Sequence, residues 1–175
     1  YMVPLSLSIA TMTLVSQSIG ANKPERAEEI GWSSVFFTTA TCITIGIAVW
    51  VFRMQLLDLY DPPAEVKAFA IPLFLFIAFY QVFDALQVAA AFILRAYRVA
   101  FWPMVIYAGS LWGVGLGGGY LLGFDVLGNT PNFLQGANGF WAANSISLGL
   151  AACLLLYLFR KTAARFEKTH PPLQV

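Results

Sequence analysis

Charged residues are almost absent from five long stretches of this chain, and this spacing constrains the fold more than any motif does. The stretches are residues 2–20, 31–52, 68–94, 101–124 and 140–159. Each is close to the 20 or so apolar residues that a helix needs to cross about 30 Å of hydrocarbon. The apolar runs are continuous and do not alternate in period two, so the pattern predicts membrane-spanning helices and not a barrel of strands.

Composition excludes the other broad classes of protein. Apolar and aromatic residues make up 59% of the chain and charged residues 11%, whereas a soluble domain is about a quarter charged. Disordered chains are poor in apolar residues, and a net charge of +1 gives no basic footprint for nucleic acid. We therefore predict an all-α integral membrane protein of five spans. Residues 1–160 would form the transmembrane fragment and residues 161–175 a polar cytoplasmic tail.

Basic residues indicate how the chain is oriented in the membrane. Of the ten Lys and Arg residues, only Arg53 and Lys67 lie in the second connector, and the other eight lie in the first and third connectors and the tail. This bias predicts that those three segments are cytoplasmic and that the N-terminus is outside. An apolar span follows Tyr1 directly, with no basic region before it. We therefore expect a C-terminal part of a longer multi-pass protein, with the missing N-terminal helices of the same polypeptide and membrane lipid as its partners.

One acidic residue breaks the apolar pattern. Asp84 lies near the middle of the third stretch, whereas the other eight acids lie in connectors or in the tail. A carboxylate at the bilayer centre costs about 2.5–3.5 kcal/mol on insertion scales, so we expect Asp84 to face the bundle interior or a water-filled cavity. Tyr80 and Gln81 precede it by four and three residues, and Gln87 follows it by three. On a helix these spacings place the four polar side chains on one stripe.

This stripe admits several interpretations. Hydrocarbon disfavours the charged form of a carboxylate, so Asp84 could take up a proton on one side and release it on the other. Carboxylate, amide and phenol oxygens would also suit Na+, and the acid could instead attract a cationic ligand directly. The competing interpretation is a hydrogen-bonded cluster that joins helices. Because no basic residue lies in any predicted span, we favour a functional site and assign cation binding to Asp84, Tyr80 and Gln87, with Asp84 as the metal ligand if the ion is Na+.

Small residues dominate the fourth stretch. Two interleaved series, which include Gly113 with Gly117 and Gly115 with Gly119, repeat at four-residue intervals. Such series let helices approach closely, and they can also mark a moving part. Pro72 would kink the long third helix or lie near its start. We assign these five residues to helix packing or to a hinge.

Catalytic and metal-binding motifs are not found in the sequence. The single histidine and the two cysteines, Cys42 and Cys153, form no pattern with ligand spacing, and both cysteines lie in apolar stretches. No nucleophile triad or phosphate loop can be assembled either. We therefore expect a protein that is not an enzyme and that needs no cofactor.

Several segments of the chain resemble the multidrug and toxic compound extrusion (MATE) family of transporters. The segment 79–87, Phe-Tyr-Gln-Val-Phe-Asp-Ala-Leu-Gln, is similar to the family's tenth helix, and residues 94–97 are similar to its exit. The segments 2–10 and 17–22 resemble the eighth helix, and residues 139–141 resemble the opening of the twelfth. The resemblance covers the whole chain, as helices eight to twelve of twelve.

The resemblance implies a twelve-helix antiporter with two lobes, which exports cationic amphipathic drugs in exchange for Na+ or H+ across the bacterial inner membrane. The acid that matches Asp84 belongs to the family's cation site in the C-terminal lobe, and the tyrosine that matches Tyr80 lies beside it. The partner acid of that site comes from the seventh helix, which this chain lacks. We assign contacts with the substrate to Gln81 and Phe83.

Two alternatives stay open. A lipid-linked sugar flippase of related architecture would move amphiphiles, although it should present cationic residues for phosphate groups and the predicted spans contain none. A membrane subunit or fragment without transport activity is the other alternative.

Overall fold

The computed structural model describes residues 2–126, 128, 131 and 134–169, apart from the side chains of residues 64, 68, 69, 72 and 76. Across these residues the secondary structure is helical and contains no strand. The helices are α1 (Met2–Gly20), α2 (Pro24–Val51), α3 (Arg53–Tyr60), α4 (Ala64–Ala96), α5 (Phe101–Ala108), η1 (Gly109–Gly117), α6 (Gly118–Gly123) and α7 (Ala137–Thr169). Five segments of the described chain are long and apolar enough to cross a membrane, which confirms the predicted all-α class with five spans.

Helical structure extends into several segments that were expected to be connectors. Helix α2 begins at Pro24, because a proline in the first turn of a helix lacks only an N–H that would have no partner there. Helix α7 continues ten residues past Phe159 to Thr169, since the Arg, Lys, Ala and Glu residues of this segment are good helix formers. Residues 161–169 of the expected tail are therefore helical, and residues 170–175 lie outside the described chain. The short helix α3 was not expected at all.

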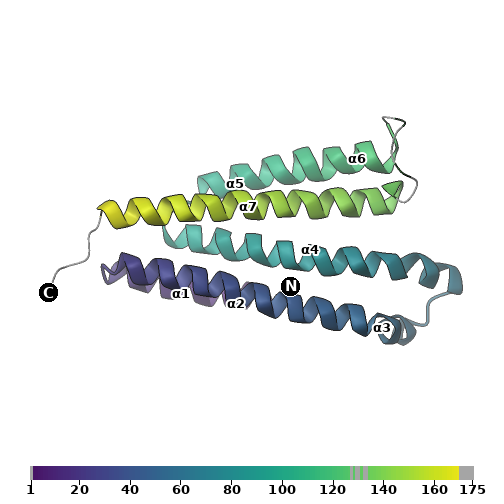
Figure 1. Ribbon diagram of the computed structural model, residues 1–175, viewed down its shortest axis with the longest axis horizontal. Coiled ribbons are helices and arrows are strands. Elements are labelled where there is room, and N and C mark those ends of the chain that lie inside the picture. Colours follow the sequence, from purple (N-terminus) through teal and green to yellow (C-terminus); the bar gives the residue numbers. More distant parts are fainter. Residues whose placement is uncertain (1, 127, 129–130, 132–133, 170–175) are drawn as a thin grey trace.

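Helix α4 lies at the centre of the bundle. It packs against α1 and α2 on one side and against α7 on the other, and α7 packs in turn against η1 and α6 (Figure 1). The turn between α1 and α2 lies at the same end of the bundle as the last turns of α7, and α3 lies at the opposite end (Figure 1). The chain therefore places the middle of α4, with the single buried acid, between helices on both sides.

The tightest packing surrounds the second half of α4. Ala89 and Ala90 are fully buried there, and Leu94 on the same helix meets Leu155 and Phe159 of α7 in one core cluster. Between membrane helices, small residues allow the backbones to approach closely and to gain van der Waals contact. This core closes the end of the bundle at which α4 and α7 finish.

The fourth apolar stretch is not one regular α-helix. Its central nine residues, η1, form a π-helix between α5 and α6. Wide helices of this kind are rare and are often found at functional sites. The glycine spacing predicted close helix packing here but gives no sign of the change of helix type.

The two glycine series face different surroundings. A Cβ atom at Gly115 would lie 2.9 Å from Ser147 Oγ of α7, and one at Gly119 would lie 2.7 Å from a ring carbon of Phe140. The absence of a side chain at these two positions therefore allows the close contact between the fourth stretch and α7.

The other positions assigned to packing or to a hinge behave differently. A Cβ at Gly113 would meet no atom within 4 Å, and one at Gly117 would meet only the Trp112 carbonyl oxygen at 3.7 Å. The backbone of Pro72 belongs to the continuous helix α4, and its side chain lies outside the described part of the structure.

Candidate functional site

Asp84 lies in the interior of the bundle, in the middle of α4. Asp84 is only 8% exposed, and Gln87, one turn later on α4, is 5% exposed. Gln87 Nε2 donates a hydrogen bond of 2.9 Å to Asp84 Oδ1. The amide therefore holds one carboxylate oxygen in place and leaves the other available to a further partner.

The other end of the Gln87 amide is also buried. Within the described chain, its Oε1 atom accepts no hydrogen bond. A buried acceptor that lacks a partner costs about 1–3 kcal/mol, so a cation or a donor group beside this oxygen would lower the free energy of the site. Two neighbouring residues thus place a carboxylate and a neutral oxygen together in the interior.

Cys42 of α2 lies in the same part of the bundle, although nothing in the sequence singles it out. The residue is fully buried, and it lies near enough to the Gln81 side chain and to Asp84 to interact with both. A lone cysteine in an apolar helix gives no signal of such a role, because the sequence does not show which face of α2 meets α4.

Tyr80 faces another neighbour. Its ring meets Trp141 of α7 edge to face, with the ring centroids 5.9 Å apart. Consecutive residues of a helix are about 100° apart, so Tyr80 reaches toward α7 while Gln81 reaches toward α2. The expected single stripe of four polar groups is therefore divided. Asp84 and Gln87 bond to each other, and the other two contact separate helices.

Phe83 and Phe79 form a ridge between two apolar grooves. One groove, of about 470 Å³, lies between α2 and α4, and the other, of about 410 Å³, lies between α4 and α7. Both phenylalanines line both grooves, and Phe79 is 57% exposed. These volumes fall in the range of sites for drug-sized molecules. Of the two residues assigned to the substrate, Phe83 thus lies beside open apolar space and Gln81 does not line either groove.

No basic residue is paired with Asp84 in the described chain. The one ion pair found there joins Lys67 and Asp58, two partly exposed residues near the α3 end of the bundle. No group of three His, Cys, Asp or Glu side chains that could hold a metal occurs among the described residues either. A complete shell for a metal cation around Asp84 would therefore include neutral oxygens or groups from elsewhere in the polypeptide.

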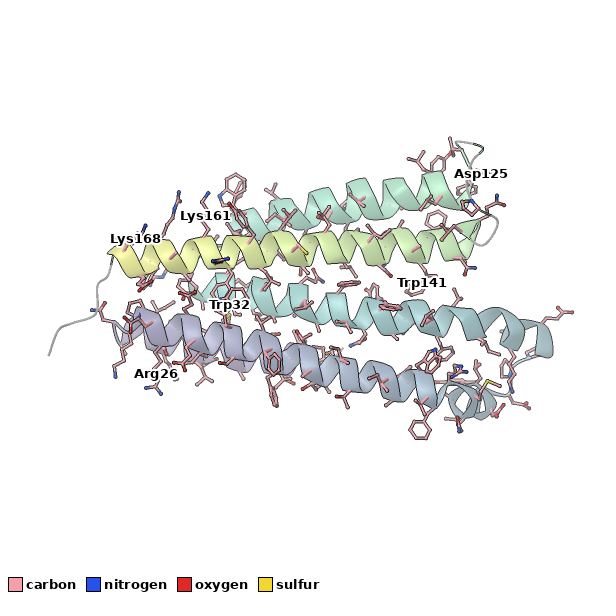
Figure 2. The ribbon with its side chains drawn as sticks, viewed as in Figure 1. Arg26, Trp32, Asp125, Trp141, Lys161 and Lys168 are labelled. Carbon is pink, nitrogen blue, oxygen red and sulfur yellow. The ribbon has the colours of Figure 1, made fainter. Side chains whose placement is uncertain are left out.

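Aromatic side chains close the bundle beyond the Asp84 pair. Tyr97, which caps α4, packs against Phe159 and Phe166 of α7, and Trp32 extends from α2 to Phe159 (Figure 2). Burial raises the pKa of Tyr97 to about 12, and the nearby carboxylate of Glu28 adds to this rise. Tyr97 is only 8% exposed, so this end of the bundle is closely packed around the phenol.

The sequence of the chain is similar to those of known proteins. The family model described as MatE matches residues 1–121. The chain is 38% identical over 165 residues to the "Probable multidrug resistance protein NorM" of Aromatoleum aromaticum, covering 94% of this chain and 35% of that protein. It is 32% identical over 175 residues to the "Multidrug resistance protein PmpM" of Pseudomonas aeruginosa, covering 99% of this chain and 36% of that one. The chain thus spans about a third of the length of these curated relatives.

A solved structure has the same fold. The crystal structure of the eukaryotic MATE transporter AtDTX14 superposes on 97% of this chain, with a TM-score of 0.81, 21% sequence identity and coverage of 37% of that protein. At this level of identity the likeness concerns the arrangement of the helices.

Proposed function

The chain belongs to the MatE family, and from that premise we propose that it is part of a multi-pass transporter that exports cationic, amphipathic drugs in exchange for Na+ or H+. The names of the NorM and PmpM relatives support multidrug export, and transport without chemical change of the substrate distinguishes this proposal from an enzyme. The remaining helices of the transporter would come from the rest of the polypeptide. The bacterial origin of these relatives supports a place in the bacterial inner membrane.

One observation carries the proposal: Asp84 is a buried acid with a hydrogen-bonding amide beside it and no cationic side chain among the described residues paired with it. An acid inside a membrane bundle is costly, and such groups mark ion and proton pathways. A bound Na+ or a proton would neutralise Asp84 and offset this cost. An antiporter needs such a group at its coupling site, because binding of the ion then lowers the free energy of the buried acid.

The residues around Asp84 suggest how the ion is held. Gln87 Nε2 fixes one carboxylate oxygen, and the vacant Gln87 Oε1 supplies a neutral ligand or accepts a hydrogen bond. Tyr80, one turn earlier on α4, contacts Trp141 of α7, so its phenol would have to turn away from that contact to supply a third oxygen. For Na+, these hard oxygen donors match a hard cation. For H+, the same amide would orient the protonated carboxyl group.

The drug would bind along the apolar grooves. Phe83 separates the two grooves and is the residue directly before Asp84, while Gln81 links the same turn of α4 to α2. A cation in the site and a drug on the Phe83 ridge would therefore act on one turn of one helix. The ion can shift the equilibrium between two states of the transporter only by its difference in affinity for them.

A single substitution tests the coupling role. In the complete polypeptide reconstituted in vesicles, Asp84→Asn should reduce gradient-driven drug efflux at least about 10-fold, because the amide cannot exchange a proton and binds cations poorly. Asp58→Asn is the matched control, since it makes the same chemical change in a residue that is paired with Lys67 at the bundle surface. Coupled efflux that survives Asp84→Asn would refute the assignment.

The identity of the ion needs a second measurement. Efflux should be recorded with a Na+ gradient at equal pH on both sides, and then with a pH gradient in Na+-free buffer. The gradient that drives efflux in the native protein and fails in Asp84→Asn identifies the coupling ion.

A further inference from the structure

A basic pocket lies between the start of α5 and the last turns of α7, far along the bundle from Asp84. It has a volume of about 460 Å³. The residues that line it are Val99, Trp102, Leu158, Lys161, Thr162 and Arg165. One wall is therefore apolar and aromatic, and the other carries two cationic side chains.

The positive charge of this pocket is not neutralised within the described chain. Lys161 and Arg165 are four residues apart, so they share one face of α7. Both residues are exposed, and no hydrogen bond or ion pair of either side chain is found among the described residues. The nearest acid in sequence, Glu167, follows Arg165 by two residues and so lies about 200° around the helix, on the opposite face.

The pocket lies at the depth of the lipid headgroups. The uncharged stretch of α7 ends at Phe159, so Lys161 and Arg165 stand about 3 and about 9 Å beyond it along the helix. The polar layer on each side of the hydrocarbon is several Å thick. Trp102, the second residue of α5, is 57% exposed, and tryptophan gathers at this boundary. Lys161 projects from the end of α7 in the same region (Figure 2).

We propose that this pocket binds the phosphate headgroup of an anionic phospholipid, with an acyl chain lying on Trp102 and Leu158. The Arg165 fork can bond two phosphate oxygens at once, and Lys161 adds a compact charge. At the start of α5, next to Val99 and Trp102, no side chain caps the helix, so the N–H groups that precede Pro103 also favour an anion. Eight of the ten basic residues lie in the first and third connectors and in the segment after Phe159, and basic pockets between spans on the cytoplasmic side are suited to anionic lipids.

The combination of features distinguishes a lipid from a free anion. A free phosphate ion would use the charges of Lys161 and Arg165 and would gain nothing from the aromatic wall. A phospholipid uses both, because its headgroup and its chain meet at the depth where these residues stand.

The test compares two pairs of charges on the same helix. The complete polypeptide, purified in a neutral detergent, is titrated with phosphatidylglycerol and, separately, with phosphatidylcholine and with inorganic phosphate, and bound lipid is counted by native mass spectrometry. Lys161→Gln with Arg165→Gln should weaken phosphatidylglycerol binding about 10-fold or more, given the strength of single basic contacts with anionic lipid. The matched control, Arg160→Gln with Lys168→Gln, removes the same charge from exposed residues of α7 outside the pocket and should change binding less than about threefold.

Three results would overturn the proposal. Equal losses in the two double variants would reveal general attraction to the charged end of α7. Equal binding of phosphatidylcholine, or full competition by inorganic phosphate, would show that no anionic lipid is selected. Phosphatidylglycerol with brominated chains should also quench tryptophan fluorescence in the native protein more than in Trp102→Phe, and equal quenching would contradict the assigned position of the chain.

Discussion

The two halves of α4 belong to one helix but have different surroundings. After Asp84 the helix is buried on several sides, with Ala85, Ala89 and Ala90 fully enclosed. Before Asp84 it presents Leu75 and Phe79 to open grooves. The buried acid stands at the boundary, so it has dense packing on one side along the helix and open apolar space on the other.

Side-chain size explains this difference. Alanines let the backbones of α1, α2 and α7 approach α4, whereas rings hold the neighbouring helices apart. A carboxylate at such a boundary can exchange an ion with one side while the other side stays closed. Access to Asp84 therefore depends on the half of α4 that precedes it, where Phe79 lines open grooves.

Loss of an aromatic ring that packs against the buried half of α4 should have the largest effect on stability. Phe159 is fully buried against Trp32 and Tyr97, so Phe159→Ala should destabilise the protein by about 3–5 kcal/mol. Phe79→Ala removes the same ring from the open half and should cost less than about 1 kcal/mol. Thermal unfolding of both variants in detergent measures the contrast, and equal losses of stability would remove the distinction between the halves.

Alkaline pH should have the second largest effect, a loss of stability that comes from Tyr97 at the closed end of the bundle. The pKa of Tyr97 is raised from 10.0 to about 12, so an unfolded chain loses this proton first. Stability is therefore complete below pH 10 and falls as the pH rises from 10 to 12, by up to about 2 kcal/mol. Tyr97→Phe should lack this part of the decline. If the pH dependence of unfolding is the same in both proteins, water reaches the phenol and the end is open.

At the boundary, Gln87→Leu removes the donor to Asp84 and nearly preserves the volume. The same change removes Gln87 Oε1 as a neutral ligand, so with Na+ as the coupling ion the half-saturating Na+ concentration should rise about 10-fold, which corresponds to about 1.4 kcal/mol. Gln81→Leu, six residues earlier, removes a neighbour of Cys42 and should leave this concentration within about twofold. The concentration dependence of efflux gives both values, and equal shifts would argue against a specific Asp84–Gln87 unit.

The smallest effect on stability is expected in the fourth span, where side-chain size also decides how closely two helices pack. Gly119→Ala places a methyl group against the Phe140 ring and should lower the unfolding temperature. Gly113→Ala meets no neighbour and should leave it unchanged or raise it slightly, because alanine favours helices by up to about 1 kcal/mol. The reverse order would show that α6 and α7 are not held together by this contact.

Much of the fold follows from the sequence alone. The distribution of charge predicted an all-α protein with five spans, because the hydrocarbon thickness sets the number of apolar residues that a helix must contain. The same distribution singled out Asp84, and the position of this residue in the middle of a span made its burial an expectation. Local patterns of this kind need no knowledge of neighbouring helices.

What the sequence could not provide depends on the rotation and spacing of helices. The contact of Gln81 with Cys42 and that of Tyr80 with Trp141 each join residues far apart in the chain. The difference between Gly113 and Gly119 likewise depends on which face of the helix meets α7. The π-helix arises from small changes in backbone geometry that glycine spacing alone does not specify.

The proposed antiport requires that the carboxyl group of Asp84 gains and loses a cation or a proton inside the bundle. Infrared difference spectroscopy of the complete polypeptide, with isotope-labelled aspartate, measures this directly when Na+ or pH is changed. We expect a carboxyl band that responds to one of these ions and that disappears in Asp84→Asn but persists in Asp58→Asn. A native spectrum that responds to neither ion, or one that is unchanged by Asp84→Asn, would contradict it.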